Sequence, residues 1–301
     1  MSSHIVFHTM GIPVHVTIAD DISLKQRDDL KKTLFAIFDS WDRQCSRFRE
    51  DSELHHMNMQ AGNPVHVSAR MFLVIARCLE LAQETDGAFD PSAGAYLAAA
   101  GYGLPKNYTL PHQVPTYHDI RLDGRAVTIT CAPGQVLEPA GIVKGMAIDA
   151  AAQALQGIAG WMINAGGDIL THGPFGHEHV WRVGIQHPRV RNAIVTIVGI
   201  RDEALATSGT YEVVFEKEKL LRHHQVDMHS GASASDMVSL SVIAPTAQQA
   251  DEYASIGMLL GKERGVAYLD AHGVPYLLLG NDGGMIKNEA FTKRELPVEP
   301  Q

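Results

Sequence analysis

The chain has 301 residues, of which 45% are hydrophobic, and its formal net charge is −9. This length and composition predict a core large enough for one big domain or two closely joined ones. The acidic balance argues against non-specific binding to nucleic acid or to an acidic membrane, which needs clustered Lys and Arg side chains. No apolar run approaches the roughly 20 residues that span a bilayer.

The N-terminus lacks the basic region and apolar core of a signal peptide, so we expect a cytoplasmic protein without a membrane span. The cysteines, Cys45, Cys78 and Cys131, lie far apart and form no CxxC pair. Buried reduced thiols are therefore favoured over a thiolate zinc site or a disulfide framework.

The first part of the chain alternates between strand and helix patterns. Residues 4–8 and 13–19 alternate in hydrophobicity as paired strands do. A helix follows, because apolar residues recur at helical spacing, and Ser23 with Gln26 predicts a capping box at its start. Its apolar stripe is Leu30, Leu34, Ile37, Phe38 and Trp41. A second helix is expected from Ser68 to about Thr85, ending at the turn 86–87. Its inward residues are expected to be Phe72, Ile75, Leu79 and one of Leu81 and Ala82.

The second part continues with mixed elements. Alternating runs at 116–121 and 126–131 predict a hairpin that turns at 123–124. Strands are expected at about 179–186, 193–200, 237–244 and 276–279, and Thr246 can cap a helix that runs to Gly261. Strands and helices do not alternate strictly, which favours an α+β fold with mixed or antiparallel sheets and packed helices over a parallel doubly wound sheet. Without an internal repeat or a linker, we expect one domain over residues 1–301.

The stretch 137–149 combines a small-residue turn, the carboxylate of Glu138, the ammonium of Lys144 and an Ala-rich helix that runs through Leu155. A helix that starts just after the turn would direct free N–H groups and the positive end of its dipole at an anion. These features together indicate a phosphate-and-cation site. An ordinary strand-to-helix connection remains the alternative.

Small-residue turns also occur at 87–94, 164–168 and 207–210. None of them is a Walker loop or a GxGxxG fingerprint, so the standard nucleotide motifs are lacking. Each turn alone is consistent with a purely structural role. Together, with their interleaved carboxylates, they suggest a large ligand in a shallow cleft lined by backbone.

Asp251 and Ser255 are four residues apart on an expected helix and so share a face. A carboxylate and a hydroxyl, with a backbone carbonyl from elsewhere, make a hard oxygen site suited to magnesium, although two surface residues would show the same spacing.

The His223, His224, Asp227 and His229 cluster lacks the helical spacing that makes imidazoles converge on a transition metal. A single histidine acting as general base is the more useful role. Ser208 lacks the G-x-S-x-G frame, which argues against a serine hydrolase.

The ordered series of motifs resembles the FAD:protein FMN transferase (ApbE) family, and the resemblance covers nearly the whole chain. The motifs are Met10-Gly11, Ser52-Glu53-Leu54 followed by Asn58, Gly87-Ala88-Phe89-Asp90-Pro91, Gly141-Ile142-Val143-Lys144-Gly145, Asn164-Ala165-Gly166-Gly167-Asp168, Ala206-Thr207-Ser208-Gly209 and Asp251 through Ser255. Each motif is weak alone, and their order and spacing carry the match.

The resemblance implies an ApbE-like α+β architecture, related to the T-fold, with a cleft for FAD. Such enzymes use magnesium to cleave the FAD pyrophosphate and pass FMN to a threonine or serine hydroxyl of a partner flavoprotein. Some relatives instead hydrolyse FAD to FMN and AMP. A non-catalytic protein that keeps the FAD cleft is a third possibility.

The resemblance also implies roles for individual residues. Met10, Phe48 and the turn Ala88-Phe89-Asp90 would contact the flavin or adenine part. Glu138 and Lys144 would address FAD and its phosphates, with Lys144 taking part in catalysis. The backbone of Gly141 with Asp251 and Ser255 would hold magnesium. His224 would be the base that activates the acceptor hydroxyl, with Gln225 beside it in the FAD site.

Three departures from the family pattern stand out. Glu138-Pro139-Ala140-Gly141 replaces Asp-Leu-Gly-Gly, and Ser255 replaces the usual metal-site threonine. The segment from Gln225 to Gly231 lacks the family's arginine. These changes leave open a branch with a different target and a paralogue with weak catalysis.

Overall fold

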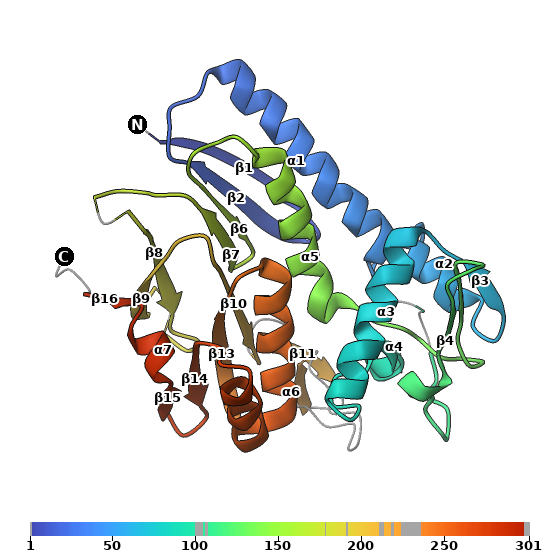
Figure 1. The fold of residues 1–301 in the computed structure, drawn as a ribbon. Coiled ribbons are helices and arrows are strands. Elements are labelled where there is room, and N and C mark those ends of the chain that lie inside the picture. Colours follow the sequence, from blue (N-terminus) through green and yellow to red (C-terminus); the bar gives the residue numbers. More distant parts are fainter. Residues whose placement is uncertain are drawn as a thin grey trace. The chain divides into compact units, whose positions relative to one another are not determined.

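The structure is a computed structural model that describes residues 2–99, 105, 108–177, 179–190, 192–210, 214–217, 220–223 and 236–297 (Figure 1). The chain divides into two compact units. The first unit is formed by Met1–Asp39, Lys144–Glu212 and Ser235–Gln301, and the second by Ser40–Val143 and Val213–Ala234. The expectation of a single domain over residues 1–301 stays a prediction.

The first unit is organised around an eight-stranded sheet in the order β1-β2-β6-β7-β10-β13-β14-β15, in which every neighbouring pair is antiparallel. The strands are β1 Ser3–Thr9, β2 Ile12–Ile18, β6 Trp161–Ala165, β7 Asp168–His172, β10 Ala204–Gly209, β13 Met237–Ala244, β14 Tyr276–Gly280 and β15 Met285–Lys287. The strands expected at 4–8, 13–19, 237–244 and 276–279 are confirmed. The α+β class with antiparallel sheets is confirmed as well.

Helices and a second sheet cover opposite faces of the central strand β13. Leu240 faces helix α6 (Ala247–Ala271), where a Cβ added to Gly257 would lie 2.4 Å from its Cδ2. Ile243 has the opposite parity and packs in a core cluster with Val198 of β9. Because both faces are covered, β13 is buried along its whole length, which explains its unbroken apolar run.

The second sheet of the first unit has the order β16-β9-β8, with β8 Trp181–Gln186, β9 Ile194–Ile200 and β16 Glu295–Leu296. Its strands β8 and β9 confirm the pair expected at 179–186 and 193–200. The remaining elements of this unit are most of α1 (Leu24–Cys45), the larger part of α5 (Ala140–Ala152), η3 (Gln153–Leu155) and α7 (Glu289–Thr292). Figure 1 shows α6 running alongside β10 and β13, which it contacts.

Helix α6 breaks at Gly261, whose φ of 78° and ψ of 173° are not helical. The end expected there is correct for the first segment, but a second helical segment continues to Ala271. The side chain of Asp236 makes this restart possible, because its Oδ2 accepts the backbone N–H of Lys262 at 2.9 Å. The glycine alone predicts a helix end, because the sequence does not show that Asp236 lies where it can accept the N–H of Lys262.

The second unit consists of short elements. They are the end of α1, α2 (Glu53–Met59), β3 (Pro64–His66), α3 (Ala69–Glu84), η1 (Pro91–Ala93), α4 (Gly94–Ala99), η2 (Tyr117–Asp119), β4 (Arg121–Asp123), β5 (Thr128–Thr130), the start of α5, β11 (Val214–Lys217) and β12 (Leu220–His223). Strands β3, β5 and β4 form one antiparallel sheet, and β11 pairs with β12.

Two expectations for this unit need correction. The buried residues of α3 are Met71, Val74, Ile75, Cys78, Leu81 and Ala82. Phe72 and Leu79 are only half-buried, so the apolar stripe is rotated from the one expected. The hairpin starts later than expected, at Arg121, because the preceding residues form η2, where Asp119 accepts the N–H of Thr116 at 2.9 Å. None of the helices in the described part of the chain has the length and apolar character that crossing a membrane requires.

Candidate functional site

Glu138 is buried directly before α5 in the second unit. Its Oε1 accepts the backbone N–H of Ala140 at 2.8 Å, and its Oε2 lies 3.0 Å from Nε of Arg47. The two paired side chains are 7% and 11% exposed, respectively. Burial raises the pKa of Glu138, while Arg47 and the Ala140 N–H act in the opposite direction. The Glu138 carboxylate therefore caps the start of α5, which the sequence predicts to face an anion.

The motif around Ser52 and Asn58 holds this carboxylate in place. The side-chain amide of Asn58 donates to the Leu137 carbonyl at 3.0 Å and accepts the Leu137 N–H at 2.9 Å. Ser52 caps α2, and Glu53 accepts both the N–H and the hydroxyl of Ser68 at the start of α3. The sequence singled out these residues, and the structure gives them a supporting role.

The turn Ala88-Phe89-Asp90 is buried, with exposures of 8%, 5% and 6%. Asp90 Oδ1 accepts the N–H of Ser92 at 2.7 Å, and Oδ2 accepts the N–H of Tyr117 at 3.0 Å. Burial raises the pKa of Asp90 despite these bonds. The part of this turn in FAD binding stays a prediction.

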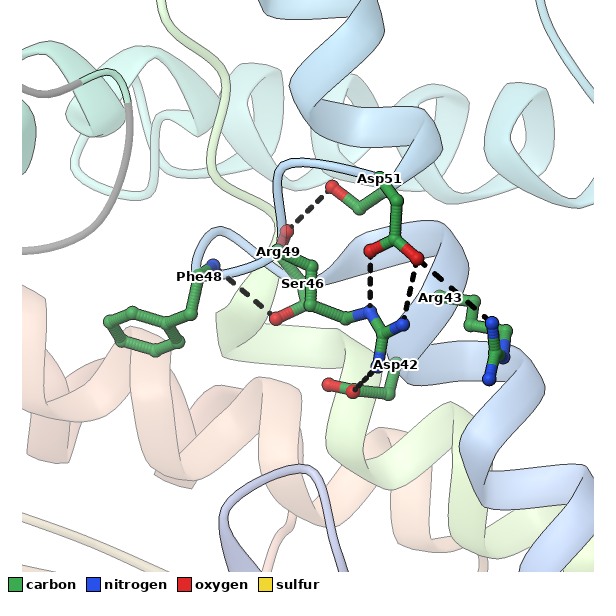
Figure 2. Close-up of polar contacts among 7 residues, drawn as sticks. Asp42, Arg43, Ser46, Phe48, Arg49 and Asp51 are labelled. Atoms are coloured by element: carbon green, nitrogen blue, oxygen red, sulfur yellow. Dashed lines mark hydrogen bonds and ion pairs between the residues drawn. The ribbon is translucent and has the colours of Figure 1, made fainter.

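Phe48 lies on the loop between α1 and α2 and is 58% exposed. Figure 2 shows its ring pointing away from the ion pairs of the loop. Arg49 joins Asp51, at 2.9 Å, to Asp42, at 3.3 Å, and the N–H of Phe48 donates to Ser46. An aromatic side chain on a braced loop suits stacking against a planar ring, the role that the resemblance implies.

Lys144 and Asp168 form an ion pair in the first unit, with 2.9 Å between Nζ and Oδ2. The other oxygen of Asp168 accepts the backbone N–H of Thr207 on β10 at 3.3 Å. Asp168 was not among the predicted site residues. Its motif, residues 164–168, was recognised as a turn, but nothing in the sequence linked it to Lys144.

Asp251 and Ser255 lie on one face of α6 and are buried, with exposures of 6% and 8%. The alternative of two surface residues is thereby excluded. Asp251 Oδ2 accepts the backbone N–H of Gly145 at 2.9 Å. The hydroxyl of Ser255 lies 3.5 Å from that of Ser208.

These groups are oxygen donors of the kind that magnesium prefers. Magnesium commonly uses one or two protein carboxylates and completes its shell with water and substrate phosphates. Among the described residues, no three His, Cys, Asp or Glu side chains cluster in a way that could hold a metal. A single carboxylate with nearby hydroxyls fits magnesium better than a transition metal, and the metal itself stays a proposal.

The remaining predicted residues are placed as follows. Met10 and Gly11 form the tight turn between β1 and β2, with φ of 52° and 73°. Gly141 lies in the first turn of α5, in the part that belongs to the second unit. His224 and Gln225 lie outside the described residues, as do Asp227 and His229 of the histidine cluster.

The model of the ApbE family matches residues 10–278 of this chain. The chain belongs to the ApbE family. The resemblance seen in the sequence, and with it membership of a family of transferases, is thus confirmed.

Curated ApbE relatives extend over most of the chain. The FAD:protein FMN transferase of Haemophilus influenzae is 26% identical over 308 residues, which cover 95% of this chain and 89% of that protein. Its counterpart from Vibrio cholerae is 28% identical over 293 residues, covering 92% and 86%.

Solved ApbE structures share the fold. The ApbE protein of Thermotoga maritima superimposes with a TM-score of 0.87 at 24% identity, covering 99% of this chain and 100% of that one. The flavin transferase ApbE of Vibrio cholerae gives a TM-score of 0.82 at 26% identity, covering 98% and 99%.

Proposed function

We propose that this chain transfers FMN from FAD to a threonine or serine hydroxyl of a partner flavoprotein, with magnesium as the metal. One observation carries the site assignment. The bond from the Gly145 N–H to Asp251 brings a buried carboxylate of α6 to the residue that follows Lys144 on α5. This bond supports the proposal, because cleavage of a diphosphate needs a cation site and an ammonium group near each other, and the candidate cation ligand and Lys144 both belong to the first unit.

The proposed roles are those that the family resemblance implies. Asp251 and Ser255 would hold magnesium together with the Gly141 carbonyl, and the metal would neutralise charge on the diphosphate. Lys144 would bind the same diphosphate and stabilise the negative charge that develops during transfer. Glu138, Met10, Phe48 and the 88–90 turn would bind the rest of FAD, with Gln225 in the same site.

The reaction itself needs an activated hydroxyl. His224, proposed from the resemblance, would take the proton of the acceptor hydroxyl. The hydroxyl oxygen then forms a bond to the phosphorus of the FMN half, and the bridging P–O bond breaks to release AMP. If water attacks in place of the protein hydroxyl, the products are FMN and AMP, which is the pyrophosphatase alternative.

The test combines FAD, magnesium and a candidate acceptor flavoprotein. Covalent flavin fluorescence on the acceptor in a denaturing gel supports transfer, whereas free FMN with AMP supports hydrolysis. FAD binding without either product points to a non-catalytic protein. Absence of FAD binding under all conditions contradicts the proposal.

Asp251→Ala tests the metal site within the same assay. We expect metal-dependent turnover to fall by about 10²-fold or more, because a preorganised charge contact of the transition state is lost. Asp28→Ala, an exposed position of α1, is the matched control and should keep full turnover. Circular dichroism verifies the fold of both variants, and full turnover of a folded Asp251→Ala protein would remove Asp251 from the site.

A further inference from the structure

Asp168 is held at a fixed point by a two-residue turn. Strands β6 and β7 pair so that Ala165 faces Asp168, with Gly166 and Gly167 between them. Both glycines have positive φ, 61° and 103°, which is the geometry of a tight hairpin turn with matching strand twist. Asn164 closes the turn by accepting the Gly167 N–H at 3.0 Å. Asp168 thus starts β7 with little freedom.

The polar contacts of Asp168 are few for a buried carboxylate. Its side chain is 3% exposed. An ionised carboxylate has room for about four hydrogen bonds. Asp168 receives one long bond from Thr207 at 3.3 Å, and within the described residues its Oδ2 has the ion pair with Lys144 but no hydrogen bond of good geometry.

Asp149, a carboxylate of the same unit, shows how hydrogen bonds can satisfy a partly buried carboxylate. Its two oxygens accept the backbone N–H groups of Ala247 and Gln248, both at 2.9 Å, and cap the start of α6. Among the described residues, Asp168 has no comparable pair of hydrogen bonds. Burying a charge with sparse contacts costs stability, so its presence is better explained by what it does to Lys144.

We propose that Asp168 is a positioning residue that holds the Lys144 ammonium in the orientation in which it meets the diphosphate of the substrate. This inference rests on the proposed function. The pair spans two elements, α5 and β7, so the carboxylate fixes the end of a side chain that is flexible on its own. The Lys144 side chain is 24% exposed, so it is not sealed inside the core. Preorganisation of this kind lowers the ordering cost at the moment of binding.

The first experiment needs no flavin. Lys144 is modified with an amine-acylating reagent in the native protein, and its rate is measured by mass spectrometry relative to the exposed Lys25. In Asp168→Asn we expect about tenfold faster modification, because the end of the flexible lysine side chain is no longer held against a carboxylate and reaches the reagent more freely. Asp149→Asn is the control, because it removes another partly buried carboxylate of the same unit and should leave this ratio unchanged. An unchanged ratio in Asp168→Asn would overturn the proposal, whatever the outcome of the flavin assays.

The second experiment separates positioning from a structural role through Lys144→Met. In the wild-type background, Asp168→Asn should lower kcat/KM for FAD by about 10²-fold, the typical cost of misplacing a reacting group. In the Lys144→Met background the same change should cost less than about twofold, because a residue that acts only through Lys144 has nothing left to position. A full 10²-fold loss in both backgrounds would show that Asp168 acts independently of Lys144.

Discussion

Arg47 and Arg49 lie two positions apart but pair with carboxylates in opposite surroundings. The pair of Arg47 with Glu138 is nearly buried, with exposures of 11% and 7%. The pair of Arg49 with Asp51 is exposed to 28% and 63%, so water and salt screen it (Figure 2). Removing an arginine should therefore have very different consequences at the two positions.

We predict that Arg47→Met lowers the free energy of unfolding by about 3–5 kcal/mol, because it leaves the Glu138 carboxylate buried without its opposite charge. Arg49→Met should cause a far smaller loss. Urea unfolding at pH 7 measures both. Glu138→Gln added to Arg47→Met should restore part of the loss, since the uncompensated charge is then gone. Equal losses in the two single variants would contradict this view of Glu138.

At the scale of residues, the sequence indicated the chemical groups of the site but few of their partners. Motifs and spacing in the sequence point to Glu138, Lys144 and Asp251. They do not point to the partners Arg47 and Asp168, because an ion pair between residues many positions apart leaves no spacing pattern in the sequence. Pairing of this kind is decided by tertiary packing, which propensity and periodicity do not encode.

At the scale of elements, the helices with an N-terminal cap were predicted best. The bonds between Ser23 and Gln26 confirm the capping box of α1, and Thr246 caps α6 as expected. Helix α2 was not predicted, since its 7 residues are too few to show a helical period. Long, capped helices could thus be read from the sequence, whereas short elements depended on neighbours that the sequence does not reveal.

The crossing of α5 and α6 depends on a single glycine. A Cβ added to Gly145 would lie 2.4 Å from the carbonyl oxygen of Ala247 and 2.7 Å from its carbonyl carbon. Both atoms are backbone, so they cannot move aside as a flexible side chain would. The same residue donates its N–H to Asp251, and the close approach therefore also positions the candidate metal site.

Gly145→Ala should lower the free energy of unfolding by about 1–3 kcal/mol through overpacking, although alanine is the better helix former by about 1 kcal/mol. Thermal and urea unfolding measure the loss. Gly124→Ala is the control, because the nearest atom to its Cβ, Cζ of Phe72, is 3.8 Å away and its φ is not positive. A Gly145→Ala protein as stable as this control would show that α5 and α6 can separate without cost.

At the scale of the whole molecule, length and composition left one or two domains open, and no linker in the sequence pointed to two compact units. The boundaries at 39–40 and 143–144 fall inside α1 and α5. Domain boundaries are usually recognised by flexible linkers rich in proline, glycine or polar residues. At these two boundaries the chain passes between units within a continuous helix, so no such linker marks them in the composition.

Buried carboxyls with raised pKa values occur in both units, namely Asp90 and Glu138 in the second and Asp149 in the first. In each case burial is the main cause. A carboxyl whose pKa is higher in the folded than in the unfolded state penalises folding once it ionises. Its stabilising contribution is therefore complete below the unfolded pKa, near 3.8 for Asp and 4.5 for Glu, and is lost as pH rises through the folded pKa.

The direction of this pH dependence can be tested by comparing the free energy of unfolding of the wild type with that of a variant that lacks one of these carboxyls. Glu138→Gln cannot ionise at position 138, and an arginine keeps its charge over this pH range, so the unpaired Arg47 of the variant adds only a constant offset. We expect the free energy of unfolding of the wild type, minus that of Glu138→Gln, to fall as pH rises from about 4.5 toward 7. Urea unfolding at several pH values measures this difference.

Asp51→Asn provides the opposite case, because the Arg49 side chain lowers the pKa of Asp51. The contribution of Asp51 is present above its ordinary value of 3.8 and is lost only as pH falls below it, so the corresponding difference should not fall between pH 4.5 and 7. If the difference between the wild type and Glu138→Gln does not change over this pH range, ionisation of Glu138 does not cost folding stability. The ion pair with Arg47 then compensates the cost of burial in full. If the difference falls as expected, the site retains a carboxylate that costs stability, which is the pattern of a group kept for binding and not for the fold.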